Sequence, residues 1–274
     1  MSPHNALLLS PARLSPLFVG SSLNLVLFTL ELIQAFAYLG SKARRRDSVF
    51  IKLGVLLNLV SDLLGTMACC AVTYLYVVKF WGNTDALQKQ FWPIVVVDFS
   101  VGVSALMAHF FMITRYWQMT KHHTISVFLV LILLAATAGT FGCGVLLALS
   151  PDDQSILLDQ FSTLALLLHA VGASIIAILL LWQLYKRKDT PVTRWNFFQK
   201  TISSLIETGT VAAIVFAAAF GMWYGFRSQT VWIPFTFVVA RVYSCTILFV
   251  LYTRKESTSN ASGNAVEAGA DQSK

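Results

Sequence analysis

The sequence predicts an all-α fold: a polytopic transmembrane bundle of about seven helices, with the N-terminus outside and the C-terminus cytoplasmic. Three observations predict it: the apolar composition, a series of long apolar stretches, and a one-sided distribution of Lys and Arg among the loops. Of the 274 residues, 56% are hydrophobic and only 12% are charged. A soluble domain of this length does not carry so much apolar surface, so the surrounding solvent is expected to be lipid.

Seven apolar stretches of about 20 residues or more have the length that a bilayer-crossing helix needs. They cover residues 17–39, 49–78, 91–113, 124–149, 161–185, 201–226 and 230–252. All seven tryptophans lie at or just beyond the ends of these stretches, where amphipathic rings prefer the headgroup level. The first stretch is too long for the apolar part of a cleavable signal and runs into a basic loop, so we expect a retained first span.

Lys and Arg set the orientation, because short cytoplasmic loops carry an excess of both. The loops at 42–46, 115–121 and 186–200 are rich in them, whereas the loop at 150–160 has none and contains three aspartates. The rich side is therefore predicted to be cytoplasmic. The net charge of +7 comes from these loops and forms no stripe with interleaved aromatics, so no nucleic-acid partner is expected.

The predicted domains follow from this orientation. Residues 1–16 form an extracellular segment, 17–253 the transmembrane domain, and 254–274 a polar, low-complexity cytoplasmic tail that is expected to be disordered. The glycosylation sequon at Asn260 lies in that tail and is expected to stay unmodified in cells, which a glycosylation-reporter fusion can measure. Modification of Asn260 would invert the whole predicted topology.

Ionisable side chains inside the spans are the most informative residues, because each costs roughly 2.5–3.5 kcal/mol at mid-helix unless it is paired or hydrated. They are Glu31, Asp62, Asp98, His109, His169, Glu207 and Arg241. The candidate intramembrane polar cluster consists of Glu31, Asn58, Asp62, Glu207 and Arg241. Asp98 and His169 fall in the outer halves of their spans and form a candidate outer cavity. His109 is expected to be hydrogen-bonded within the core or to lie at the lipid edge.

Helical spacing places these groups on inward faces. The first span presents Asn24, Glu31, Gln34 and Tyr38 on one face, and the second presents Asn58, Asp62, Gly65 and Cys69. Arg241 lies roughly 16 Å from the cytoplasmic end of its helix, at nearly the depth of Asp62, roughly 20 Å, whereas Glu207 lies roughly 9 Å in. Because arginine stays charged, it needs a carboxylate, and Asp62 is the first choice and Glu207 the second. The pair has two interpretations that both stay open: it only fixes helix register, or it serves function.

Small residues at four-residue spacing predict helix–helix seams. They are Ser100, Ser104 and Ala108 in the third span, and Gly209, Ala213, Ala217 and Gly221 in the sixth, where a homo-oligomer interface is the alternative. The four cysteines, Cys69, Cys70, Cys143 and Cys245, all fall inside spans and are expected to be packing residues. No metal site, redox chemistry or cofactor is expected from them.

Several segments resemble an uncharacterised seven-span membrane protein family of basidiomycete fungi, classified only as a domain of unknown function. In the first third the similar residues are Gln34, Tyr38, Asp47, Lys52 and Asp62. In the last third they are the runs 206–209, 241–244 and 252–254. The family usually has lysine at the position of Arg241 and asparagine at that of Cys245. The resemblance implies a seven-span fold and a fungal source, and it supplies no activity, ligand or catalytic residue.

Three functions remain as hypotheses. A receptor-like sensor comes first, because the outside N-terminus, seven helices, inward polar cluster and Ser/Thr-bearing tail share the layout of seven-helix receptors. It would take a small-molecule ligand and a cytoplasmic partner at the tail. A small-molecule or proton transporter comes second, since buried charges can relay ions. An intramembrane enzyme such as a cyclase, with Asp62, Glu31 or Glu207 as the acid, comes third. The expected location is the plasma membrane or an endomembrane.

Overall fold

The computed structural model describes residues 11–40, 48–81, 83, 89–149, 156–186, 209–225 and 231–251. The predicted disordered tail and most of the predicted N-terminal segment lie outside these ranges. Throughout the described residues the regular structure is helical and contains no strand, which confirms the all-α fold class.

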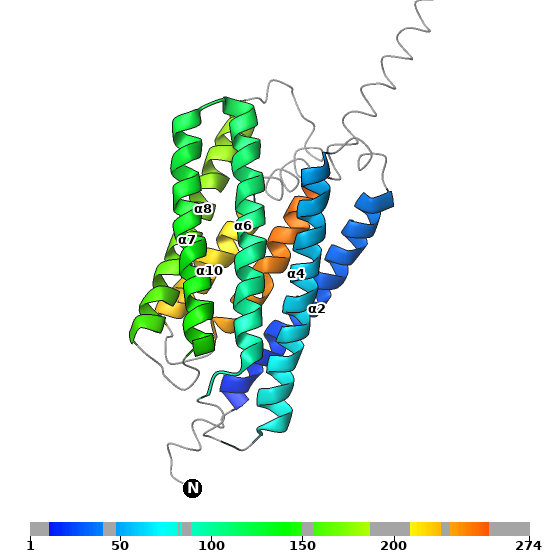
Figure 1. Ribbon diagram of the computed structural model, residues 1–274, viewed down its shortest axis with the longest axis vertical. Coiled ribbons are helices and arrows are strands. Elements are labelled where there is room, and N and C mark those ends of the chain that lie inside the picture. Colours follow the sequence, from blue (N-terminus) through cyan, green and yellow to red (C-terminus); the bar gives the residue numbers. More distant parts are fainter. Residues whose placement is uncertain are drawn as a thin grey trace, which may run out of the picture.

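The helices follow the apolar stretches closely. They are α2 (Pro11–Gly40), α4 (Val49–Tyr74) with its π-helical continuation η1 (Leu75–Lys79), α6 (Trp92–Thr120), α7 (His123–Leu149), α8 (Ile156–Lys186), α10 (Thr210–Gly225) and a final helix, Ile233–Leu251. Six of these segments are long and apolar enough to cross a membrane, and α10 is the exception. In Figure 1 the final helix, drawn in orange, runs between α6 and α4, so it can contact both sides of the bundle.

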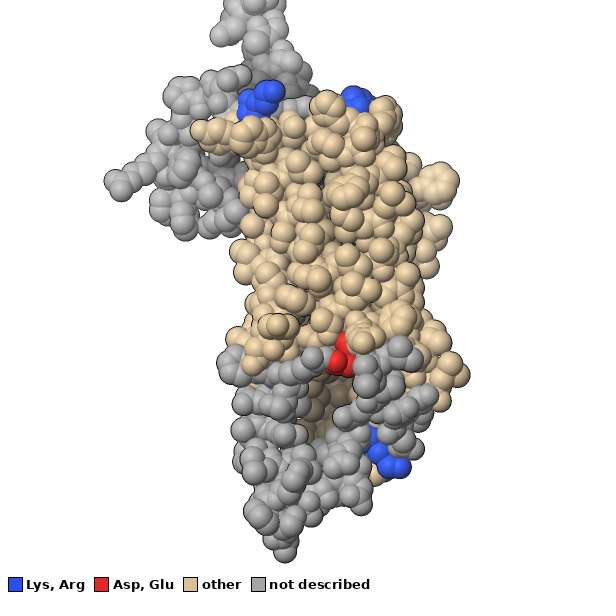
Figure 2. Space-filling view, turned by 90° about the vertical axis from the view of Figure 1, so that its left-hand side faces the viewer, with Lys and Arg blue, Asp and Glu red and all other residues tan. Residues whose placement is uncertain are grey.

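The outer surface of the helices is apolar. On α2, Val26, Ile33 and Phe36 are 59%, 60% and 70% exposed, although their side chains are large and hydrophobic. Figure 2 shows a face on which Lys and Arg appear only toward the ends of the molecule, a red acidic group also lies toward the lower end, and the broad middle is tan and uncharged. An apolar belt with charges at its rims is the surface of an integral membrane protein.

The α6–α7 hairpin shows that α6 extends past the predicted end of its span at residue 113. It continues to Thr120, and Lys121 then adopts a left-handed conformation with φ of 58° and donates its backbone N–H to the carbonyl of Trp117. The ammonium of Lys121 lies 4.8 Å from the centroid of the Trp117 ring, so the turn also has a cation–π contact. Hydropathy predicts where a helix leaves the lipid, whereas α6 continues until the backbone turns at Lys121.

The sixth predicted span differs from the sequence prediction. We expected one helix over 201–226, but Gly209 has φ of 71° and α10 begins at the next residue. A left-handed residue cannot continue an α-helix, and glycine adopts this conformation at low cost. The 16 residues of α10 extend about 24 Å, less than the roughly 30 Å of a hydrocarbon core.

The small residues of this segment therefore do not form one uniform face. Ala213 is buried against Ala173 and Ala177 of α8, which is the predicted close helix–helix contact. Ala217 and Gly221 are exposed. Gly209 lies ahead of the helix and does not extend its face, which corrects that part of the predicted pattern. The oligomer interface stays a prediction.

Candidate functional site

The polar face of α2 points into the bundle, as its spacing predicted. Asn24 and Glu31 are completely buried and Tyr38 is 1% exposed, whereas Ile33 and Phe36 point outward. The seven-residue separations along this face correspond to nearly two full turns each, which keeps the three buried side chains in line. The helix thus carries two amide or carboxyl groups into the apolar core.

The polar face of α4 meets that of α2 and also approaches α6. Asn58, Asp62, Gly65 and Cys69 are all buried. Ser100 of α6 donates a 2.8 Å hydrogen bond to the backbone carbonyl of Ser61, which fixes α6 against α4. The predicted seam of small residues on α6 is therefore the surface that packs on α4.

Asp62 is surrounded by donors from three helices. Ser104 of α6 donates to Oδ1 at 2.7 Å, and Asn58 of α4 donates to Oδ2 at 3.0 Å. Ser244 of the final helix also donates to Oδ2, and the guanidinium of Arg241 forms an ion pair with Oδ1. A carboxylate offers about four acceptor positions, so these donors satisfy Asp62 as an anion.

Arg241 lies at the centre of the group. Its side chain is 2% exposed, and its Nε donates to the amide oxygen of Asn24 at 2.9 Å. The guanidinium also lies 5.7 Å from the centroid of the Phe28 ring. The ion pair predicted from residue depth is therefore present, and Asn24 adds a second partner from α2.

We call this group the Asp62–Arg241 cluster and define it by seven residues on four helices. Its members are Asn24 and Glu31 of α2, Asn58 and Asp62 of α4, Ser104 of α6, and Arg241 and Ser244 of the final helix. It links helices that are more than 200 residues apart in the chain, as in the contact between Asn24 and Arg241. Sequence reasoning missed Ser244 as a site residue, although its three-residue separation from Arg241 places both on one helical face.

Glu31 is the member that no donor reaches. It is completely buried, no donor within the described helices contacts either of its carboxyl oxygens, and the side chain within hydrogen-bonding range of it is the carboxyl group of Asp62. The charged groups that act on it are Asp62 and Arg241. The cluster thus contains two acids and one guanidinium.

The other candidate residues are distributed elsewhere. Glu207 lies outside the described residues. Asp98 is half-buried on α6 and does not line the pocket that His169 lines, so their shared outer cavity stays a prediction. Cys69 and Cys143 are buried free thiols. Over the part of the chain that the structure describes, no three His, Cys, Asp or Glu side chains gather as a metal site.

A second polar group surrounds His109 of α6. Its Nδ1 lies 2.7 Å from the carbonyl of Ala105, and its Nε2 lies 3.2 Å from the hydroxyl of Tyr243. Because a carbonyl can only accept, Nδ1 carries the proton and Tyr243 donates to Nε2 in the neutral ring. His109 is therefore a satisfied core histidine, one of the two outcomes expected for it.

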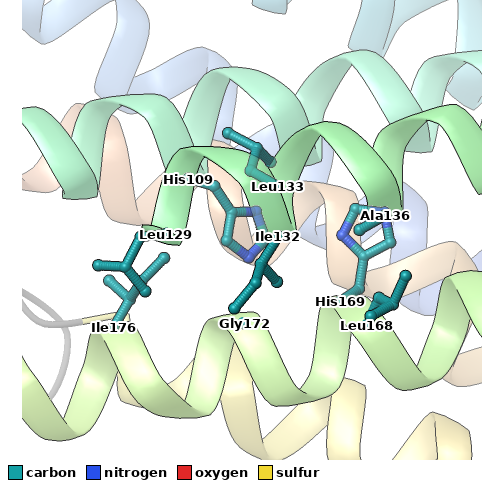
Figure 3. Close-up of a pocket in the computed structure, with 9 residues that line it drawn as sticks. All are labelled: His109, Leu129, Ile132, Leu133, Ala136, Leu168, His169, Gly172 and Ile176. Atoms are coloured by element: carbon teal, nitrogen blue, oxygen red, sulfur yellow. The ribbon is translucent and has the colours of Figure 1, made fainter. Parts of the chain in front are cut away.

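His169 of α8 lies beside this pair, with its ring centroid 5.6 Å from that of His109. Both rings line a small pocket between α6, α7 and α8 together with apolar side chains (Figure 3). The pocket has room for about one water molecule. His169 Nε2 lies 3.1 Å from Thr140 Oγ1, whereas its Nδ1 is buried and has no partner among the described residues.

Comparison with known proteins adds one finding. Residues 169–256 match the model of a family of unknown function, DUF6534. The matched range contains Arg241 and Ser244 and agrees with the last third of the resemblance seen in the sequence, whereas Glu31 and Asp62 lie outside it. No curated protein and no solved structure matches the chain.

Proposed function

We propose that this protein is a seven-span, receptor-like membrane sensor and that the Asp62–Arg241 cluster is its switch. The observation that carries the proposal is the ion pair between Asp62 and Arg241, which is enclosed in the core and bonded to α2, α4, α6 and the final helix. In this layout α10 belongs to the remaining crossing, and the N-terminus is outside.

A switch explains the cost of the cluster. Taking an arginine and a carboxylate out of water costs several kcal/mol per ion, and apolar residues of similar size often stabilise a core equally well. The best-attested use of such polar groups is to select one arrangement over another. A pair shared by four helices would hold those helices in one of two arrangements until a signal changes the balance.

The geometry supports a sensor better than a catalyst or a relay. All acceptor positions of Asp62 are occupied by side chains of the protein itself, and the residue is completely buried. A general acid or an ion-binding station must present its carboxyl group to a substrate or to water. Because donors from three helices fill the four acceptor positions of Asp62, this carboxylate holds those helices in one arrangement.

A distance measurement between two helix ends tests the switch. Phe50 at the start of α4 and His122 in the α6–α7 turn are exposed, so spin labels can be attached to Phe50→Cys and His122→Cys in a Cys70→Ala, Cys245→Ala background. We expect one main distance in the full chain in lipid nanodiscs. With Asp62→Asn and Arg241→Met added, a second distance should become strongly populated, because the ion pair that holds the helices in one arrangement is absent.

The control for this measurement is Lys79→Met, which removes an exposed cation outside the cluster and should leave the distance distribution unchanged. If the double replacement folds and its distribution equals that of the wild type, the pair fixes register only, and the switch is refuted.

A further inference from the structure

The starting point is the carboxyl group of Glu31, which no donor of the described helices contacts and which lies within hydrogen-bonding range of the carboxyl group of Asp62. Glu31 lies in the same buried site as Asp62 and Arg241, yet Asp62 holds four donors and Glu31 holds none within the described helices. An ionised carboxylate in this position would be an uncompensated charge, and such a charge is among the most costly groups in a membrane interior.

Among the described residues, the neighbouring helices bring no second cation to Glu31. From α4 the titratable groups near this site are Asp62 and Cys69, and from the final helix they are Arg241 and Cys245. Where α6 packs against this site, it contributes the neutral hydroxyl groups of Ser100 and Ser104. With both thiols neutral, two ionised acids beside one guanidinium would leave the site with a charge of −1.

The kind of ligand follows from the space available. The pocket beside His169 is water-sized, and Glu31 does not line it. A proton needs no cavity, and it removes the surplus charge without moving a side chain. A metal ion or an organic cation would need both space and several oxygen ligands.

We infer that Glu31 is a proton-binding site whose proton keeps the switch closed, an inference that deepens the proposed function and rests on it for the coupling. With the proton bound, Glu31 is neutral and Asp62 is the one carboxylate of the cluster that pairs with Arg241. When the carboxyl O–H bond of Glu31 breaks, the proton passes to water that enters the opening cluster, and the new carboxylate competes with Asp62 for the guanidinium. The sensor would then respond to alkaline pH or to any signal that lets water reach Glu31.

Infrared spectroscopy of the full chain in nanodiscs tests the proton directly. A protonated carboxyl group has a C=O band that shifts on H/D exchange, and isotope-labelled glutamic acid assigns it to Glu without any mutation. We expect a Glu band at neutral pH that is lost as the pH rises. It should be absent in Glu31→Gln and retained in Asp98→Asn, the control acid in the membrane outside the cluster.

The spin-label pair on Phe50→Cys and His122→Cys tests the coupling. Raising the pH should populate the second distance in the wild type but not in Glu31→Gln, which is permanently neutral. The inference is overturned if no labelled Glu band exists at neutral pH, if the band persists in Glu31→Gln, or if a Glu31 band titrates while the distance stays constant. These results are separate from the switch itself, which the Asp62→Asn, Arg241→Met distances test at a single pH with Glu31 intact.

Discussion

Replacing Arg241 with methionine is expected to lower the free energy of unfolding by about 3–5 kcal/mol. The change leaves the completely buried carboxylate of Asp62 without its cation and the amide oxygen of Asn24 without its donor. Methionine fills a similar volume, so the loss reports charge rather than a cavity. Reversible unfolding of the full chain in mixed micelles measures it.

A double-mutant cycle shows whether this loss of unfolding free energy comes from the interaction between Asp62 and Arg241. Asp62→Asn combined with Arg241→Met should unfold within about 1 kcal/mol of the wild type, because no unpaired charge remains. Asparagine keeps an acceptor for the donors around position 62. Lys79→Met removes an exposed cation and should change stability by no more than about 0.5 kcal/mol. Additive losses from the two cluster replacements would mean that Asp62 and Arg241 do not stabilise each other.

The sequence predicted the spans well because lipid imposes a length and a composition on every helix that crosses it. The second stretch was expected over 49–78, and the structure has α4 with η1 over 49–79. The α6 end and the α10 start were less predictable, since each depends on one left-handed residue, Lys121 or Gly209. Neither backbone angle follows from hydropathy.

The pairing of Asp62 with Arg241 was also predictable, because depth along two helices can be counted from the sequence and an always-charged residue needs a partner. The remaining contacts of the cluster depend on how far each helix is shifted along its axis relative to its neighbours, which counting gives only approximately. Asn24 and Glu31 share one α2 face and lie about 10 Å apart along the helix axis, so the axial position of α2 decides which of them meets Arg241. In the structure Asn24 accepts the hydrogen bond from Arg241, and no donor of the described helices contacts Glu31.

Replacing Gly65 with alanine is expected to destabilise the protein by about 1–3 kcal/mol, the usual cost of an extra methyl group in a packed core. A Cβ at this position would overlap the side chain of Ser100 on α6 and lie 2.9 Å from Arg241 Nη2. Ser100 cannot simply turn away, because even its Cβ would be 2.7 Å from the new atom. The α4 and α6 helices would have to separate, which also disturbs the cluster. The same unfolding measurement quantifies the change.

Gly54 is the matched control, because it lies on α4 three turns earlier and a Cβ there has nothing within 4 Å. Gly54→Ala removes a flexible residue from the same helix without adding a contact, so it should leave stability unchanged or raise it by up to about 1 kcal/mol. The difference between the two glycines then isolates the close approach of α4 to α6. Equal effects at the two positions would show that Gly65 is not a close-contact residue, and the packing around Asp62 and Arg241 would have to be looser than the structure shows.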